Sequence, residues 1–206
     1  MIPIVLIGGG GHCRSCIDVI ESTTSYEVFG IVGEIDGEKM PVLGYPVLGT
    51  DEALVGLLQD CPMALITVGQ IKTPELRKRL YHLVQDLGGS FPVVVSPQAY
   101  VSRRAEVGVG TIVMHGATLN VGVSVGINCI INSQALVEHD AEIGSHSHVS
   151  TGARVNGGAS IGEGTFLGSG AVVNQGITVG NNCIIASGAV IRSDVPEGTQ
   201  VRGEWQ

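Results

Sequence analysis

Residues 137–168 read VEHDAEIGSHSHVSTGARVNGGASIGEGTFLG, and an aliphatic residue recurs in this stretch at every sixth position. The register continues in both directions, so that every sixth residue from Val101 to Ile191 is Val, Ile or Leu, sixteen in a row. A period of six fits neither an α-helix nor an amphipathic strand. It predicts a hexapeptide β-helix, in which each six-residue unit lays one short strand on one side of a triangular prism.

Small residues recur four positions after most of these aliphatic residues, as in Ala105, Ala117 and Ala135. We expect the aliphatic side chain to point into the prism and the small residue to fit its crowded corner. Three units complete one coil, so residues 18 apart stack, and each coil depends on its neighbours for stability. Residues 96–206 are therefore predicted to form an all-β parallel β-helix.

The segment 1–95 has a different pattern, in which apolar runs alternate with helical spacing. This alternation implies a parallel sheet with crossover helices. The segment is too small for the two mononucleotide-binding halves of a full Rossmann fold, so we expect an α/β Rossmann-like half-domain. The sequence predicts strands at 2–7, 26–33, 63–69 and 91–95, and helices after the first strand and at 51–60 and 74–88.

A glycine-rich loop, GGGGH (8–12), lies between the first strand and the first helix. Glycines let the backbone approach a phosphate, and a helix N-terminus offers unpaired N–H groups. Gly8 and Gly10 fit the dinucleotide fingerprint, but Cys13 takes the place of its third glycine. We favour a nucleotide-sugar or diphosphate site over bound NAD or a structural turn. His12 is either a phosphate contact or an exposed turn residue.

Composition excludes several classes of protein. A net charge of -8 argues against a nucleic-acid partner, and no apolar run reaches the length of a membrane span. The N-terminus lacks the basic region of a signal peptide, and five scattered cysteines favour a reducing cytoplasm. Cys13 and Cys16 form a CxxC pair, which we interpret as small buried side chains rather than a redox centre.

Three of the six histidines lie within ten residues, at His139, His146 and His148. His139 is the third residue of its unit and should point outward, where it could act as a general base. Asp140 is the first choice for the carboxylate that orients the ring, and Glu138 is the second. We interpret His148 as a ligand contact and His146 as a surface residue.

A metal site is the main alternative for this cluster, because neutral imidazoles bind zinc readily. His146 and His148 are two residues apart, and His139 precedes them by seven and nine. His115 lies 24 residues before His139, which is not a whole number of 18-residue coils. These spacings differ from those of the zinc carbonic anhydrases built on the same repeat, so we expect no metal.

The combination of the two segments resembles the bacterial sugar acetyltransferases of the sialic acid O-acetyltransferase family. That family includes N-acetyltransferases that act on nucleotide-linked 4-amino sugars. The resemblance implies a left-handed coil and a homotrimer with acetyl-CoA between the β-helices of neighbouring subunits. It is carried by the hexad array and by GGGGH (8–12), LGYPVLGT (43–50), IINSQALVEHD (130–140) and SHVSTGARVNGG (147–158).

The resemblance also implies roles for individual residues. His139 falls at the catalytic base and Asp140 at the acid beside it. The residues expected to bind the nucleotide sugar are Gly9, Gly10, Gly11, His12, Glu34, Gln70, Asn132 and Glu138. Those expected to bind acetyl-CoA are His148, Gly157, Ser169 and Ser187.

The sequence departs from the family at three places. Gly33-Glu34 stands where relatives often have an acidic pair, so Glu34 or Asp36 is the candidate for nucleoside recognition. Gly69-Gln70 replaces a common Gly-Asn, and VRGEWQ replaces the usual Gly-x-Pro-Ala-Lys tail. The contacts to the nucleoside and to the CoA adenine are therefore expected to differ.

Together these features predict an acetyl-CoA-dependent N-acetyltransferase that acts on a nucleotide-linked amino sugar of the 4-amino-4,6-dideoxy type. No Cys or Ser stands in a nucleophile arrangement, so we expect direct transfer, in surface polysaccharide or glycan biosynthesis. O-acetylation of a sugar such as sialic acid is the near alternative. A zinc carbonic anhydrase-like trimer and a non-catalytic scaffold are more distant ones. The sequence leaves open the sugar, the nucleoside and N- versus O-transfer.

Overall fold

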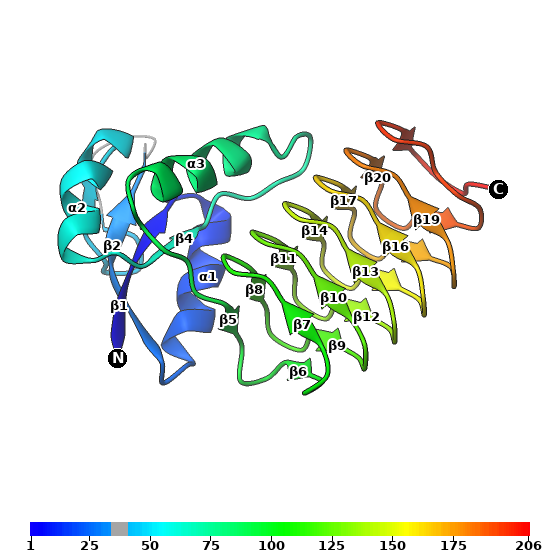
Figure 1. Ribbon diagram of the computed structural model, residues 1–206, viewed down its shortest axis with the longest axis horizontal. Coiled ribbons are helices and arrows are strands. Elements are labelled where there is room, and N and C mark those ends of the chain that lie inside the picture. The colour runs from blue at the N-terminus through cyan, green and yellow to red at the C-terminus, as the bar shows by residue number, and fades with distance from the viewer. Residues whose placement is uncertain (34–40) are drawn as a thin grey trace.

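The computed structural model describes residues 1–33 and 41–206 and has two parts, an N-terminal α/β domain and a long β-helix (Figure 1). The C-terminus lies at the end of the β-helix that is farthest from the N-terminal domain. Two candidates for nucleoside recognition, Glu34 and Asp36, fall outside the described residues.

The N-terminal domain is a four-stranded parallel sheet in the order β3-β2-β1-β4. The order places the first strand in the middle, so the glycine-rich loop that follows it begins beside β4. The strands are β1 (Ile2–Ile7), β2 (Tyr26–Val32), β3 (Val47–Gly49) and β4 (Ala64–Ile66). The helices are α1 (Gly11–Glu21), the 3₁₀ turn η1 (Asp51–Ala53), α2 (Leu54–Asp60) and α3 (Glu75–Asp86).

One predicted strand belongs to the other part of the molecule. The segment 91–95 contributes β5 (Val94–Val95), which pairs with β8 (Ile112–Val113) of the β-helix and not with the N-terminal sheet. The reason is visible in the register, because Val95 lies one six-residue unit before Val101. The division of the chain into 1–95 and 96–206 remains a proposal, and β5 places the last two residues of the first segment in the β-helix.

The β-helix is a prism with three faces, each a parallel sheet of two-residue strands. The first face holds β5, β8, β11 (Ile130–Ile131), β14 (His148–Val149), β17 (Phe166–Leu167), β20 (Ile184–Ile185) and β22 (Gln200–Val201). The second holds β6 (Tyr100–Val101), β9 (Thr118–Leu119), β12 (Leu136–Val137), β15 (Arg154–Val155), β18 (Val172–Val173) and β21 (Val190–Ile191). The third holds β7 (Glu106–Val107), β10 (Ser124–Val125), β13 (Glu142–Ile143), β16 (Ser160–Ile161) and β19 (Thr178–Val179).

The interior of the prism confirms the hexad prediction. The aliphatic residues from Val113 onward are buried in one continuous core, and Val101 and Val107 pack against its first coil. The small residues that follow them, such as Ala117 and Ala135, are buried in the same core. Ile131 pairs with Val149, so residues 18 apart stack as expected. The chain therefore forms a left-handed parallel β-helix behind a short α/β domain.

The three faces differ in what their outward side chains contact. On the first face, Val94, Ile112 and Ile130 are buried in a core shared with α1 and the N-terminal sheet. The third face presents polar residues such as Glu106 and Glu142, which are exposed. The N-terminal domain therefore packs on the first face and on the turns that border it.

The two cysteines of the CxxC pair lie in this shared core. Cys13 and Cys16 are fully buried on the inner side of α1, and both are free thiols. Burial raises the pKa of both thiols, so neither forms a thiolate readily. Their environment supports the interpretation of these residues as core side chains.

Within the described ranges, no helix combines the length and apolar character needed to cross a bilayer.

Candidate active site

A cleft of about 1030 Å³ opens at the carboxyl ends of β1 and β4. Its walls are the glycine-rich loop 8–12, the segment 67–69 and the apolar side chains of Leu76 and Leu80. The carboxyl edge of a parallel sheet is where α/β folds bind ligands. The predicted residues Gly9, Gly10, Gly11 and His12 all line this cleft.

Two glycines of the loop differ in what they require. Gly8 has a φ of +110°, and a Cβ there would lie 2.5 Å from Val68 Cγ2, so Gly8 is needed for packing. Gly10 precedes α1 with a φ of -76°, and a Cβ there would meet no atom within 4 Å. The backbone at Gly10 therefore faces open space inside the cleft, as a phosphate site requires.

Four predicted residues converge where the N-terminal domain meets the first face. His148 is 7% exposed, and its Nδ1 lies 2.7 Å from the carbonyl oxygen of Gln70. A carbonyl only accepts, so Nδ1 carries the proton and Nε2 accepts from Asn132 Nδ2 at 3.1 Å. The His12 ring lies 6.4 Å from that of His148, centroid to centroid. This set forms an inner polar cluster from both domains.

Two buried atoms of the inner polar cluster have no hydrogen-bond partner among the described residues. His12 Nε2 and Gln70 Oε1 are buried and lack a hydrogen bond within residues 1–33 and 41–206. Burial, with a smaller contribution from the Arg77 cation, lowers the pKa of His12 to about 3. His12 is therefore a half-buried, neutral imidazole with a buried Nε2 atom, and not an exposed turn residue. Unpartnered buried polar atoms beside a cleft are suited to contact a ligand.

His139 lies elsewhere, in the turn between β12 and β13, with 55% of its side chain exposed. Its Nδ1 is 3.0 Å from Asp140 Oδ2. An ionised carboxylate only accepts, so Nδ1 carries the proton and Nε2 is left with a free lone pair. Glu138, the second choice, instead accepts from Asn120 Nδ2 at 2.9 Å. The pair that can orient a base is thus His139 with Asp140.

The His139 ring lies against Gly157, one coil further along the prism. A Cβ at Gly157 would lie 2.5 Å from His139 Nε2, so the ring occupies the space that any side chain there would fill. The two residues line a groove of about 580 Å³, together with Glu138, Asn156, Asn174, Gln175, Ile177 and Arg192. Nε2 therefore faces a polar groove.

Similarity to known proteins agrees with this arrangement. Residues 3–84 match the family described as the PglD N-terminal domain, and residues 158–193 match the bacterial transferase hexapeptide repeats. A histidine variant of perosamine N-acetyltransferase from Caulobacter crescentus, solved with CoA and GDP-perosamine, is 34% identical. The match covers 96% of this chain and 92% of that protein, with a TM-score of 0.89. The chain belongs to the nucleotide-amino-sugar N-acetyltransferase family.

Other structures place the acetyltransferase in the same group. The acetyltransferase domain of PglB from Neisseria gonorrhoeae, solved with acetyl coenzyme A, is 31% identical to this chain. The match covers 96% of this chain and 94% of the PglB domain, with a TM-score of 0.87. WeeI from Acinetobacter baumannii is 17% identical with a TM-score of 0.59, which indicates the fold alone. A comparison with curated proteins finds no match.

The residues predicted to bind the cofactor are spread around the prism of the acetyltransferase. Ser169 and Ser187 lie in turns between the first and second faces, whereas Gly157 lies between the second and third. His148 is covered by the N-terminal domain, with both ring nitrogens engaged inside the chain. A single chain does not bring these four residues together, and the burial of His148 does not support its predicted contact with the cofactor.

The prediction that His146 is a surface residue is wrong. His146 is 5% exposed, and Asn128 Nδ2 donates to its Nδ1 at 2.9 Å. The Tyr81 ring of α3 meets it edge-on, with centroids 5.5 Å apart. The hexad register shows only that His146 points out of the prism. It does not reveal that α3 covers this corner of the acetyltransferase.

The three clustered histidines lie at different places on the prism. His139 is in a turn between the second and third faces, His146 is in a turn between the third and first, and His148 is on the first face. Among the residues that the structure describes, no three His, Cys, Asp or Glu side chains form a group that could hold a metal ion.

Replacing Gly157 by Ala is expected to lower kcat about 10-fold to 100-fold, because the new Cβ pushes the His139 ring by about 1 Å. The backbone of Gly157 does not lie in the left-handed region, so the fold should tolerate alanine. Steady-state kinetics would measure kcat and the KM for the sugar substrate, which should not change. Gly203→Ala is the control, because a Cβ there meets open space. Equal kcat values for the two variants would contradict this reason for the glycine.

Acidification is expected to destabilise the acetyltransferase before its carboxylates titrate. Burial lowers the pKa of His146 and of His148 to about 4 and that of His12 to about 3. In the unfolded chain the same groups bind protons near pH 6.5, so the unfolded state takes up more protons as pH falls. The stability they contribute is thus present above about pH 6.5 and lost below it.

Thermal melts from about pH 7.5 to about pH 5 would test this expectation. The wild-type midpoint should fall over this range. His146→Asn suits the φ of +60° at this position and should lose less stability than the wild type over the same range. Equal losses of stability in the two proteins would mean that His146 takes up a proton in the folded state as readily as in the unfolded state.

Proposed function

We propose that this acetyltransferase moves the acetyl group of acetyl-CoA to the amino group of a nucleotide-linked 4-amino-4,6-dideoxy sugar, with His139 as general base. The observation that carries the proposal is the His139–Asp140 contact of 3.0 Å, which leaves Nε2 free to accept a proton over Gly157. The matched proteins were solved with CoA and GDP-perosamine or with acetyl coenzyme A, which supports both substrates. The setting proposed is surface polysaccharide or glycan synthesis.

The chemistry needs a base more than it needs an acid. A sugar ammonium must lose one proton before its nitrogen can attack the thioester carbonyl, and His139 Nε2 is placed to take that proton. The C–N bond forms as the C–S bond breaks, the nitrogen gives up its second proton, and the thiolate, a fair leaving group, takes up a proton and departs as the CoA thiol. Asp140 stabilises the imidazolium that results. The backbone N–H of Gly157 is the candidate for holding the developing oxyanion, because that of Gly158, the other candidate, already donates to the carbonyl of His139 at 2.9 Å.

The cleft of the N-terminal domain suits the nucleotide part of such a substrate. The loop 8–12 supplies N–H groups at the start of α1 for a diphosphate. Leu76 and Leu80 add an apolar wall, and the free atoms of His12 and Gln70 can hydrogen-bond to a sugar. Neutral His12 and His148 leave the amino group of the sugar without a nearby imidazolium to repel it.

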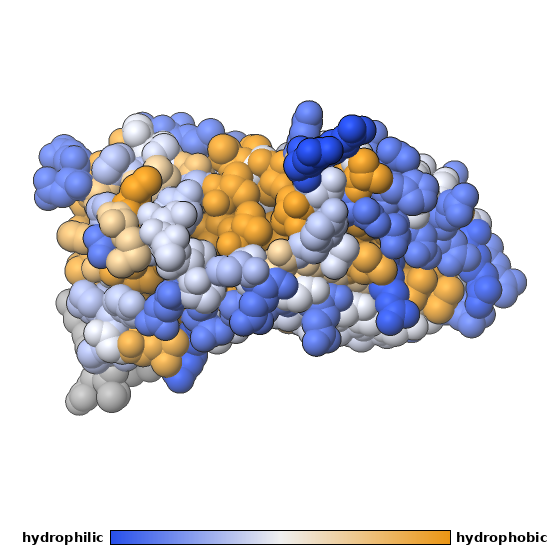
Figure 2. Space-filling view, turned by 90° about the horizontal axis from the view of Figure 1, so that it is seen from below, coloured by the Kyte–Doolittle hydropathy of each residue, from blue (hydrophilic) through white to orange (hydrophobic). Residues whose placement is uncertain are grey.

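We further propose that a second copy of the chain completes the site, within a homotrimer. His139 and Asp140 are exposed in a turn between the second and third faces, whereas the cleft lies in the N-terminal domain, which packs on the first face. The second face, with Leu136, Val172 and Val190 only partly buried, is the apolar face that the N-terminal domain leaves uncovered. Figure 2 shows hydrophobic residues gathered midway along one side of the molecule, with mostly hydrophilic residues towards its C-terminal end. Both features support association through the β-helix.

Release of free CoA thiol tests the proposed function. Purified protein would be mixed with acetyl-CoA and a panel of UDP-, GDP-, dTDP- and CMP-linked 4-amino sugars. The expected result is thiol release with one acceptor and a product that carries an N-acetyl group. The matched control is the same nucleotide sugar with a hydroxyl in place of the amine. If only the hydroxyl compound is acetylated, the protein is an O-acetyltransferase and the proposed N-acetylation is wrong.

A further inference from the structure

Arg77 of α3 is a buried cation without a carboxylate partner among the residues that the structure describes. The residue is 1% exposed, and its guanidinium is held by oxygen atoms of uncharged groups. Nη1 donates to the carbonyls of Ile66 at 2.9 Å and Val68 at 2.6 Å. Nη2 donates to the carbonyl of Asn128 at 3.0 Å and to its Oδ1 at 2.7 Å. A buried charge is costly unless it is paired or hydrogen-bonded, so these four contacts stabilise the cation, whose Nε lacks a hydrogen bond among the described residues. They therefore fix where the residues around Arg77 lie.

On one side Arg77 holds the wall of the nucleotide cleft. Ile66 ends β4, and Val68 lines the cleft. Between them, Thr67 Oγ1 donates to the carbonyl of Gly8 at 2.7 Å. The Val68 side chain fills the space that a Cβ on Gly8 would need. A shift of residues 66–68 would therefore move the start of the glycine-rich loop.

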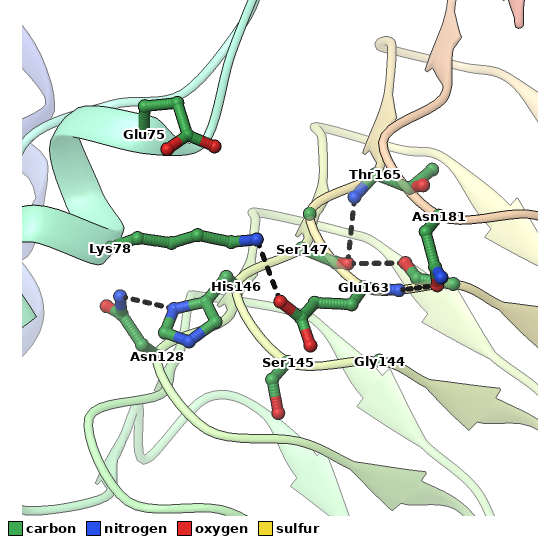
Figure 3. A network of polar contacts seen from close by, with 12 residues as sticks. Glu75, Lys78, Asn128, Gly144, Ser145, His146, Ser147, Glu163, Thr165 and Asn181 are labelled. Atoms are coloured by element: carbon green, nitrogen blue, oxygen red, sulfur yellow. Dashed lines mark hydrogen bonds and ion pairs between the residues drawn. The ribbon is translucent and has the colours of Figure 1, made fainter. Parts of the chain in front are cut away.

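On the other side Arg77 hydrogen-bonds to Asn128 of the β-helix. Asn128 is fully buried in a turn between the third and first faces and has a φ of +52°. Its Nδ2 donates to His146 in the same turn of the next coil and to the Arg77 carbonyl at 3.3 Å. Figure 3 shows the Asn128–His146 contact beside a second link between the domains, the ion pair of Lys78 and Glu163. That pair measures 2.8 Å and lies at the surface.

We propose that Arg77 is the positioning residue of the nucleotide-sugar site, which sets the glycine-rich loop in register with the β-helix surface that carries Asn132 and His148. The identity of the ligand rests on the proposed function, whereas the contacts of Arg77 do not. Arg77 does not line the cleft, so it acts through the carbonyls of residues 66 and 68. Its neighbour Lys78 also joins the two domains, because it pairs with Glu163 of the β-helix. This ion pair involves no residue of β4 or of the segment 67–69.

The charge of Arg77 gives this role a second signature. Its cation adds to burial in lowering the pKa of both His12 and His148. A neutral side chain at position 77 should therefore raise both pKa values, provided that the histidines stay buried. Histidine NMR titration of the ligand-free protein measures this effect.

The kinetic test compares Arg77→Met, Arg77→Lys and Lys78→Met in the full-length protein. Arg77→Met should raise the KM for the nucleotide amino sugar about 10-fold and change kcat and the KM for acetyl-CoA by less than about 2-fold. Arg77→Lys keeps the charge but not the fork of donors, and it should recover part of the loss. Lys78→Met should match the wild type. Parallel increases in both KM values, or equal effects of Arg77→Met and Lys78→Met, would overturn the proposal.

A measurement without substrate separates this proposal from the proposed function. Amide hydrogen exchange at residues 66–70 should be faster in Arg77→Met than in Lys78→Met, with the β-helix coils unchanged. Equal exchange would refute the role of Arg77 even if the wild type turns over substrate. Faster exchange in a protein that acetylates no amino sugar would refute the proposed function instead. If Arg77→Met does not fold, Asn128→Gly, which suits the positive φ, removes the Oδ1 contact and carries the same comparison.

Discussion

His139→Ala is expected to lower kcat about 10²-fold to 10⁴-fold, the range that a general base contributes. The side chain is exposed, and alanine removes no buried contact, so the variant should fold and assemble like the wild type. Its KM for the nucleotide sugar should change little, because the cleft is formed by the N-terminal domain and not by the turn that carries His139. Thiol release at saturating substrates measures the loss.

His82→Ala provides the matched control for this variant, because it removes an exposed histidine from α3 outside the cleft and the groove. It should retain the wild-type kcat. An amine acceptor is deprotonated in solution at high pH, so His139→Ala should recover activity as pH rises. A His139→Ala protein with full activity at neutral pH would show that another group is the base.

Gly10→Leu is expected to raise the KM for the nucleotide sugar about 100-fold, equivalent to about 2.8 kcal/mol of binding free energy. A Cβ at Gly10 meets no atom within 4 Å, so leucine should be accepted by the fold and should project into the cleft. There it would occupy the space at the start of α1 that the diphosphate requires. The KM for acetyl-CoA should stay within about 2-fold of the wild type.

Gly56→Leu is the control for this substitution. Gly56 is exposed on α2, does not line the cleft, and also offers open space to a Cβ. Binding of the nucleoside diphosphate alone, measured by calorimetry, should be lost in Gly10→Leu and kept in Gly56→Leu. Equal losses for the nucleotide sugar and acetyl-CoA would contradict the separation of the two binding sites.

Much of the β-helix could be predicted because its rule is local. An aliphatic residue at every sixth position can be recognised without knowledge of the rest of the chain, and it recurs from Val101 to Ile191, buried from Val113 onward. The same rule extends back to Val95, and applying it there would have assigned β5 to the β-helix. Taken alone, the short apolar run at 91–95 predicts a strand but does not identify its partner strand.

The candidate site was only partly predictable for a related reason. Neighbours in sequence, such as His139 and Asp140, could be paired from their spacing, and the structure brings them to 3.0 Å. The sequence predicts Gln70 and His148 at separate binding sites, yet the carbonyl oxygen of Gln70 lies 2.7 Å from His148 Nδ1 across the domain boundary. The burial and contacts of His146 and Arg77 depend on how α3 packs against the prism, which the hexapeptide repeat does not predict.

Contact with the N-terminal domain also limits how this fold can change in length. Asn128, His146 and Gly164 occupy the same turn in three successive coils, and they contact Arg77, Tyr81 and Gln70. One extra hexapeptide before this column would rotate it to another side of the prism and separate it from α3. Three hexapeptides would restore the side and shift the column by about 4.8 Å, the spacing of neighbouring strands. Even a whole coil inserted before this column would therefore displace it from α3, whereas changes in length beyond Gly164 leave these contacts in place.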